Sequence, residues 1–381
     1  MRPTLTQRTS SHDTLLAVSL ELSKGQWKIG LHDGQRMRPT VLTVNDAQPM
    51  ARLKAALALV EAIRVKWDLP PHCRIAVVFE AGQDGLWIAR ALRQLGYEAL
   101  PIDPASIPVE RRARRAKTDR LDAIRLVQSL LGWLRGERDR MHVVQVPALE
   151  AEAERHRVRD RGQLQKEVQQ HRDRLRKLLR TVGCWDAVDG DFATRLQQNA
   201  VRCYDGSPLP DPLRERLIRE CLRWDLAQAQ LTALEAGLQK ALPESVQARV
   251  TQLCRLKAVG PVGAQRLMLE LFWRQFDNRR QVGACVGLVP QPHDSGESRV
   301  DQGISKQGNG RVRALLIEMA WLWLRYQPKS ALAQWFIRRT QGSGKRGRRI
   351  AIVAVARKLA IALWRYLQAG VIPEGAELKA A

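Results

Sequence analysis

The chain has 381 residues, 45% of them hydrophobic and 27% charged, and these proportions indicate a globular protein with room for two or three domains rather than a disordered one. Its formal net charge of +24 predicts an extended polyanionic partner whose binding weakens as salt rises. The apolar stretches are short and interrupted by charges, and the N-terminus lacks a secretory pattern, so we expect a cytoplasmic protein with no membrane partner.

The amino-terminal part predicts an α/β unit. Alternating and buried apolar runs indicate strands, and apolar residues at helical spacing indicate helices. The expected elements are a hairpin over 15–22 and 27–31, a third strand over 40–44, a helix over 51–67, a buried strand over 74–79, a helix over 85–95, a strand over 98–102 and a helix that begins near Asp119. Functional residues in such sheets gather at the carboxyl ends of strands.

Asp119 and Asp122 are three residues apart, which on a helix places both carboxylates on one face. Such a pair could share a hard divalent cation, or it could belong to a solvated helix face. The surrounding segment from 111 to 140 holds ten Lys or Arg residues against four Asp or Glu residues. Carboxylates that collect Mg²⁺ among side chains that collect phosphate suggest nucleic-acid chemistry.

The scattered cysteines and isolated histidines of this chain support neither a zinc ribbon nor a His-based metal site, so a bound metal should have oxygen ligands. A ribonuclease-H-like fold needs acidic residues on its first strand, at the end of a later strand and on a helix that faces both. Glu21, Glu80, Asp119 and Asp122 supply that ordered set, and together they could hold one or two Mg²⁺ ions.

From about 150 to 245 the sequence becomes long, charged and helical. Two segments carry heptad spacing, at Leu164, Val168, His171, Leu175, Leu178 and Val182, and at Leu217, Trp224, Leu231 and Leu238. Gly190 and the stretch 205–212 break the helix between them. The pattern fits a protruding helical hairpin that pairs with itself or with another subunit, and it fits two core helices of a bundle equally well.

The part from about 246 onward is mostly helical, with a Gly- and Pro-rich loop in its middle. Residues 256–265 have the form of a helix-hairpin-helix, in which Gly260 and Gly263 would let backbone N–H groups approach a phosphate, or they form a simple turn. The run 338–358 carries basic and no acidic residues, as a solvated face or as a surface that follows phosphates.

The motifs together resemble the DEDD transposases of bacterial insertion sequences, a family guided by a bridge RNA. In the amino-terminal part the resemblance rests on Glu21-Leu22-Ser23-Lys24, on Glu80 and on 117–123. In the carboxyl-terminal part it rests on Gly260-Pro261-Val262-Gly263, Gly287-Leu288-Val289-Pro290, Ser295-Gly296, and 303–309 followed by Arg311 and Arg313.

The resemblance implies an α/β plus α architecture. It has a RuvC-like DEDD catalytic domain over 1–148, a helical coiled-coil arm over 149–245 and a mostly helical transposase domain over 246–381. The four acidic residues would bind Mg²⁺, and Ser295 would be the nucleophile that forms a phosphoserine link with DNA. Glu21 departs from the family's usual aspartate at its position, and Asp294 places an anion beside the serine.

The same resemblance implies donor and target DNA, a structured guide RNA, and a homo-oligomer, dimer or tetramer, that joins carboxylates of one subunit to the serine of another. The expected nucleic-acid contacts are Arg111, Arg112, Arg114, Arg115, Lys117, Gly260, Gly263, Lys306, Arg311, Arg313, Arg338, Arg339, Lys345, Arg346, Arg348 and Arg349. Two alternatives stay open: a Holliday-junction-type nuclease that uses water instead of Ser295, and an inactive scaffold that binds RNA or DNA.

Overall fold

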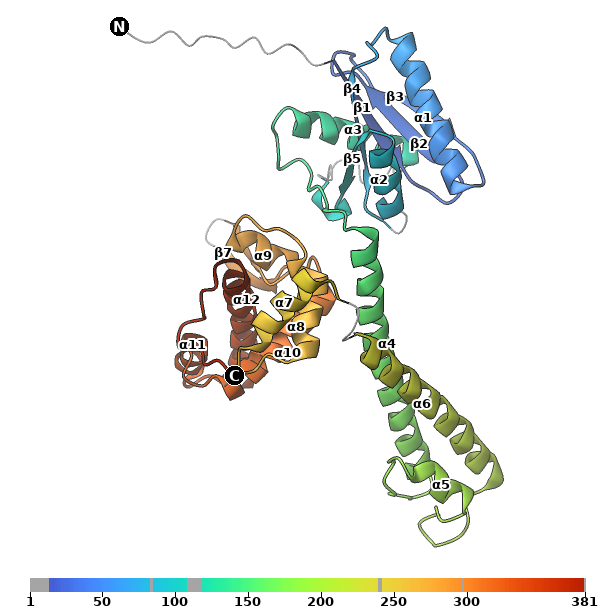
Figure 1. Cartoon of the computed structure of the whole chain (residues 1–381), viewed down its shortest axis with the longest axis vertical. Coiled ribbons are helices and arrows are strands. Elements are labelled where there is room, and N and C mark those ends of the chain that lie inside the picture. The colour runs from blue at the N-terminus through green and yellow to red at the C-terminus, as the bar shows by residue number, and fades with distance from the viewer. Residues whose placement is uncertain (1–13, 83–84, 108–117, 239–241, 296–297, 380–381) are drawn as a thin grey trace. The chain divides into compact units, whose positions relative to one another are not determined.

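The computed structural model describes residues 14–82, 85–107, 118–238, 242–295 and 298–379. The chain divides at Pro147 and Ala148 into two compact units. The second unit holds both the helical arm and the helical carboxyl-terminal part (Figure 1). The boundary expected near residue 245 stays a prediction.

The first unit is built on a five-stranded sheet, whose strands lie in the order β3-β2-β1-β4-β5. Strands β1, β2 and β3 are antiparallel neighbours, whereas β4 and β5 run parallel to β1. The elements are β1 (Leu15–Glu21), β2 (Trp27–His32), β3 (Thr40–Val44), α1 (Pro49–Lys66), β4 (Arg74–Glu80), α2 (Gly85–Gln94), β5 (Glu98–Ile102), a 3-10 turn (Pro104–Ser106) and α3 (Asp119–Leu134). Every strand and helix expected in this part is confirmed.

Helices cover both faces of this sheet (Figure 1). Because side chains alternate along a strand, Leu16, Val18 and Leu20 pack with α1 and α2, whereas Ala17 faces α3. Apolar residues of α3 that include Leu126 complete the second layer. The central strands are therefore buried on both faces, and their carboxyl ends form the edge where polar residues follow.

In the second unit, α4 (Leu149–Arg180) and α6 (Asp211–Leu238) pack side by side as an antiparallel pair, with α5 (Phe192–Gln197) between them in the chain (Figure 1). The direction follows from two ion pairs, Arg161 with Glu235 and His171 with Glu220, because the partner number falls as the first number rises. The two helices expected in this region are present and pack against each other. Pairing with another subunit stays a prediction.

The carboxyl-terminal part is mostly helical, as expected, and it surrounds an apolar core that includes the fully buried Trp323 and Leu359. Its elements are α7 (Glu244–Cys254), α8 (Pro261–Leu267), the π-helical turn η3 (Met268–Phe272), α9 (Arg279–Cys285), β6 (Pro290–Ser295), β7 (Ser298–Ile304), α10 (Gly310–Tyr326), α11 (Ala331–Thr340) and α12 (Lys345–Ala369).

One difference from the sequence analysis is the middle of this part, which was expected to be a Gly- and Pro-rich loop. Strands β6 and β7 form a two-stranded antiparallel sheet there. Proline is tolerated in strands at sheet edges, and in a two-stranded sheet both strands are edges. The hairpin therefore accommodates Pro290 and Pro292, with an irregular register between them.

No helix in the described part of the chain is long and apolar enough to cross a membrane.

Candidate functional site

Glu21 and Glu80 are the last residues of two neighbouring strands that run in the same direction, β1 and β4. The register pairs Leu20 with Phe79, the residues just before them. Both carboxylates therefore start from adjacent points on the carboxyl edge of the sheet. This is the edge at which α/β folds place functional groups.

Helix α3 brings Asp119 and Asp122 toward the same edge. The buried Ser19 hydroxyl of β1 donates a hydrogen bond of 2.6 Å to the Ala123 carbonyl of α3. Later residues of α3 pack against Ala17, which lies further back along β1. The helix thus runs antiparallel to β1, and its first turn points toward the end of the strand that carries Glu21.

Two local features place the beginning of α3. The Thr118 side chain caps the helix by accepting a hydrogen bond from the Leu121 backbone N–H, at 3.3 Å. Asp119 and Asp122 lie in the first turn, where the helix dipole favours negative charge. The same pair would be favourable in this turn without any metal.

The donor chemistry of the four acidic residues suits a hard cation such as Mg²⁺, because all four are carboxylates. Their side chains are not gathered around one point: across the described residues, no group of three or more His, Cys, Asp or Glu side chains could hold a metal ion. Asp122 instead pairs with Arg125 at 3.3 Å. The backbone thus brings the four positions to one edge, and metal binding would require their side chains to converge.

The basic residues expected just before α3, Arg111, Arg112, Arg114, Arg115 and Lys117, lie outside the described residues.

Ser295 is the last residue of β6 and pairs in register with Ser298, the first residue of β7. It therefore lies at the end of the hairpin. Neighbouring residues of both strands, such as His293 and Val300, are exposed. A two-stranded sheet has little stability of its own, so its base must be held by other elements.

The base of the hairpin is held by close backbone packing between two loops. Gly287 and Gly308 both have a positive φ, and a Cβ at Gly287 would lie 1.9 Å from the Gln307 carbonyl oxygen. Backbone N–H groups of Ser305 and Lys306 donate to the carbonyls of Val289 and Gly287. These glycines of the sequence motifs are therefore required by a close approach of the two chains.

Arg313 also holds the two loops at the base of the hairpin together. Its guanidinium donates hydrogen bonds to the carbonyls of Val286, at 3.1 Å, and Gln307, at 3.3 Å. The structure gives this residue a clear structural role, and its expected contact with nucleic acid stays a prediction. Lys306, at the foot of β7, has a positive φ of 57°.

A buried carboxylate, Glu270, links α4 to the start of α10, and no sequence pattern indicated it. Arg159 of α4 donates two hydrogen bonds to Glu270, at 2.8 and 3.2 Å, and Asn309 donates one at 3.0 Å. Burial alone would raise the pKa of Glu270, but these partners outweigh burial and lower it. Asn309 also caps α10 by accepting from the Arg311 and Val312 N–H groups.

Beside Glu270 lies a cavity of about 690 Å³, lined by residues of α4, α8, η3 and α10. Cationic side chains outnumber carboxylates in its lining, and they include Arg311, Lys166 and Arg266. Arg266 has no carboxylate within ion-pair distance in the described ranges, and burial lowers the pKa of its guanidinium. A cavity of this charge suits an anionic group such as a phosphate.

The predicted helix-hairpin-helix corresponds to α7, a turn and α8. Gly260 caps α8 with an extended backbone, and a Cβ at this residue would meet no atom within 4 Å. A Cβ at Gly263 would meet only the Met319 side chain. The start of α8 is thus sterically open. The preceding turn is braced by a later segment, because the Lys257 N–H donates to Glu377 and Lys379 donates to Val259.

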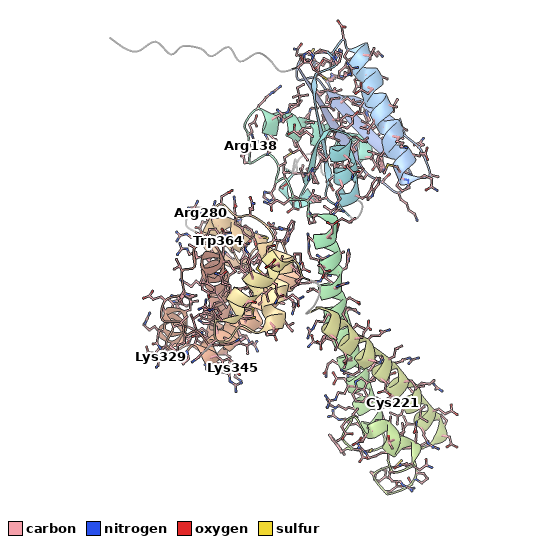
Figure 2. All side chains as sticks on the ribbon, in the orientation of Figure 1. Arg138, Cys221, Arg280, Lys329, Lys345 and Trp364 are labelled. Atoms are coloured by element: carbon pink, nitrogen blue, oxygen red, sulfur yellow. The ribbon has the colours of Figure 1, made fainter. Side chains whose placement is uncertain are left out.

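Six basic residues of α11 and α12 define a basic surface. They belong to the basic run 338–358 of the sequence. All six side chains are exposed, and none has a carboxylate within ion-pair distance in the part of the chain that the structure describes. Figure 2 labels one of them, Lys345, the first residue of α12. The six are Arg338, Arg339, Lys345, Arg346, Arg348 and Arg349. Unpaired surface cations of this density favour a polyanion.

Comparison with known proteins shows a family whose members resemble this chain. The model of the family described as "Transposase IS116/IS110/IS902 family" matches residues 250–335, a range that includes α8, the β6–β7 hairpin and α10.

Three relatives extend the likeness beyond that range. "Putative transposase y4rJ" of Sinorhizobium fredii is 40% identical, over 95% of this chain and 94% of the relative. "Probable family 20 transposase" of Pseudomonas aeruginosa is 30% identical, over 79% of this chain and 85% of the relative. "Transposase for insertion sequence element IS1328" of Yersinia enterocolitica is 26% identical, over 70% and 75%.

Proposed function

The chain belongs to the IS116/IS110/IS902 family of transposases, and from that premise we propose that it cuts and rejoins DNA strands of an insertion sequence through a phosphoserine intermediate. We further propose that its first unit is a RuvC-like catalytic domain and that a structured RNA guides it to DNA. One observation carries the proposal: Glu21 and Glu80 end neighbouring parallel strands, and the first turn of α3, which holds Asp119 and Asp122, points toward the same edge of the sheet.

In the proposed reaction, the Ser295 hydroxyl oxygen attacks the scissile phosphorus. A bond forms between that oxygen and phosphorus, and the bond from phosphorus to one sugar oxygen breaks. The serine loses its proton, and the leaving sugar oxygen gains one and becomes a free hydroxyl. The phosphoserine link conserves the energy of the broken ester bond, so a hydroxyl of another strand can later attack phosphorus, displace the serine oxygen and complete the exchange.

The position of Ser295 at the end of an exposed hairpin supports this role, because a backbone phosphate is bulky and must reach the nucleophile. Backbone hydrogen bonds from Ser305 and Lys306 hold the base of the hairpin, and Gly287 and Gly308 allow the close packing there. The four carboxylates would bind Mg²⁺, which when bound would polarise the phosphate and stabilise the leaving oxygen.

The charges of the second unit support nucleic-acid binding. The basic surface on α11 and α12 would follow a phosphate backbone, and the cavity that contains Arg311 and Arg266 would hold a single phosphate. In this proposal, base pairing with the guide RNA supplies sequence choice, and the protein binds RNA by shape and charge. The α4–α6 arm would join subunits into the dimer or tetramer that completes the site.

The deciding experiment replaces Ser295→Ala and follows strand exchange on supercoiled donor and target DNA, with the native RNA and Mg²⁺ present. We expect loss of exchange by about a thousandfold or more and loss of the covalent protein–DNA adduct. Ser298→Ala is the matched control, because Ser298 pairs with Ser295 in the hairpin register, and it should keep both activities.

Each alternative function predicts a different outcome of this experiment. Cleavage retained by Ser295→Ala would show that water is the nucleophile, as in a Holliday-junction-type nuclease. Nucleic-acid binding without exchange by the unaltered chain would indicate a scaffold.

A further inference from the structure

The tip of the arm, residues 181–210, connects α4 to α6 and includes α5 (Figure 1). It has an apolar core of its own, in which Phe192 and Leu196 are fully buried against residues of α4 and α6. Cys221 of α6, labelled in Figure 2, belongs to this core, and burial raises the pKa of its thiol to about 11. The tip is thus a packed structure with its own core. Side chains that are exposed there are exposed even though a core is present.

Trp185 and Tyr204 are nevertheless the most exposed aromatic side chains in the described part of the chain, at 77% and 82%. Aromatic side chains gain much from burial, and exposed ones are characteristic of binding surfaces. Trp185 lies in the loop before α5, and Tyr204 lies in the loop after it.

The backbone fixes both loops at one point. The Tyr204 N–H donates to the Val182 carbonyl at 3.0 Å. Gly183 has a positive φ, and a Cβ at this position would lie 2.6 Å from the Tyr204 Cβ. The loop that carries Trp185 therefore lies directly against the loop that carries Tyr204, and a glycine is required at their contact.

Cations surround Trp185. The Arg180 guanidinium lies 4.8 Å from the centre of the Trp185 ring. A cavity of about 220 Å³ beside that ring is lined by Arg172, Arg176 and Arg180. Within the described ranges, neither Arg172 nor Arg180 has a carboxylate at ion-pair distance.

Carboxylates are present too, but they do not cancel these cations. Asp186 and Asp189 also line the cavity, and Asp189 pairs with Arg195 at 3.0 Å. The cavity is smaller than the roughly 300 Å³ at which sites for drug-sized molecules begin. Its size suits a single ring.

We propose that the tip of the arm binds an unpaired nucleotide of single-stranded nucleic acid. Its base stacks on Trp185 and Tyr204, and the adjoining phosphates pair with Arg172 and Arg180. Proteins that hold single strands combine these two elements, an aromatic surface for bases and cations for the backbone. The loop of a folded RNA and an opened DNA strand both present this chemistry, and the experiment below distinguishes them.

The test uses the full chain and labelled strands of about 16 nucleotides, the upper site size of a single-strand binding fold, as RNA, as DNA and as duplex DNA. Trp185→Ala and Tyr204→Ala should each weaken single-strand binding about 5- to 150-fold, the range expected for one lost stacking contact. Duplex binding should not change. Trp185→Phe keeps an aromatic face and should keep most of the affinity.

Tyr326→Ala is the matched control, because Tyr326 is another exposed tyrosine with an arginine, Arg325, over its ring. It should bind like the unaltered chain. Arg180→Gln should lower the slope of log affinity against log salt by about 0.7, the value of one phosphate contact on a single strand. If Trp185→Ala and Tyr204→Ala weaken binding of RNA alone, the tip binds the loop of an RNA. If they weaken binding of single-stranded RNA and DNA equally, the tip binds single strands of both kinds.

A second readout locates the strand directly. Oligonucleotides that carry a photoreactive uracil should crosslink to Trp185 or Tyr204, as peptide mapping by mass spectrometry would show. Crosslinks found only outside residues 181–210, or single-strand affinity that Trp185→Ala and Tyr204→Ala leave unchanged, would overturn the proposal. Since only binding is measured, that result would leave the proposed strand exchange untouched.

Discussion

Glu21 and Glu80 stand at the ends of strands that have a neighbour on each side, whereas Ser295 stands at the end of a strand in a two-stranded sheet. The strands of the first pair are buried between helices, and those of the hairpin are exposed. Packing therefore positions the carboxylates from within the fold. The position of Ser295 depends instead on the contacts that hold the base of the hairpin.

The largest expected effect tests whether the edge of the first sheet matters. Glu80→Gln should reduce strand exchange by about three orders of magnitude, because a neutral amide is a much weaker cation ligand. Glu98→Gln is the control: Glu98 belongs to the same sheet at the opposite edge, where it binds Arg74 at 2.8 Å. Equal loss in both variants would contradict a site at the carboxyl edge.

Glu270→Gln tests whether the second unit depends on its own buried carboxylate. Loss of the charged hydrogen bonds to Arg159 should cost about 1.5–3 kcal/mol of unfolding free energy, measured by urea denaturation. A lowered pKa in the folded state means that the carboxylate stabilises fully above its ordinary value of 4.5 and loses that contribution as the pH falls through the folded value.

The unaltered chain should therefore lose stability below about pH 4.5 more steeply than the variant. If the unfolding free energies of the two proteins fell in parallel with pH, ionisation of Glu270 would not contribute to stability.

Gly30→Ala tests the packing that sets α3 on the sheet. A Cβ at Gly30 would lie 2.5 Å from the Ser19 hydroxyl and 2.8 Å from the Ala123 carbonyl, so α3 must shift. We expect a loss of about 1–3 kcal/mol and a fall in exchange, since Asp119 and Asp122 move with the helix. Gly25→Ala, where a Cβ meets nothing within 4 Å, should change neither quantity.

The smallest effect concerns the basic surface. Arg348→Gln and Arg349→Gln should each lower the salt slope of duplex binding by about 0.9, without changing the exchange rate at saturating DNA. Arg219→Gln is the comparison, because this exposed arginine already pairs with Glu215 at 3.4 Å. A slope that changes as much in Arg219→Gln would show that overall charge, rather than this surface, sets the affinity.

Much of the first unit could be predicted from sequence because its strands alternate, as in Leu16, Val18 and Leu20, or read as a continuous buried run, as in 75–79. The β6–β7 hairpin was missed because His293 and Asp294 give no apolar alternation. Sequence reasoning placed Glu21, Glu80, Asp119 and Asp122 on the right elements.

No local sequence pattern indicated the ion pair between Glu270 and Arg159. These residues are 111 positions apart, and only the packing of α4 against η3 brings them together. The exposure of Trp185 and Tyr204 was equally hidden, since aromatic residues in a helical region usually indicate core. Long-range pairing and solvent exposure are properties of the folded chain.

The hydrogen bonds between the α7–α8 turn and residues 377–379 have a consequence for the timing of folding. Val259 receives its hydrogen bond from Lys379, a residue 120 positions later in the chain. At about 5–20 residues per second, a ribosome needs roughly 6–24 seconds to add that length. During that interval the turn exists without its partner segment. The α7–α8 turn therefore gains this hydrogen bond only after nearly the whole described chain has been synthesised, long after the strands that carry Glu21 and Glu80.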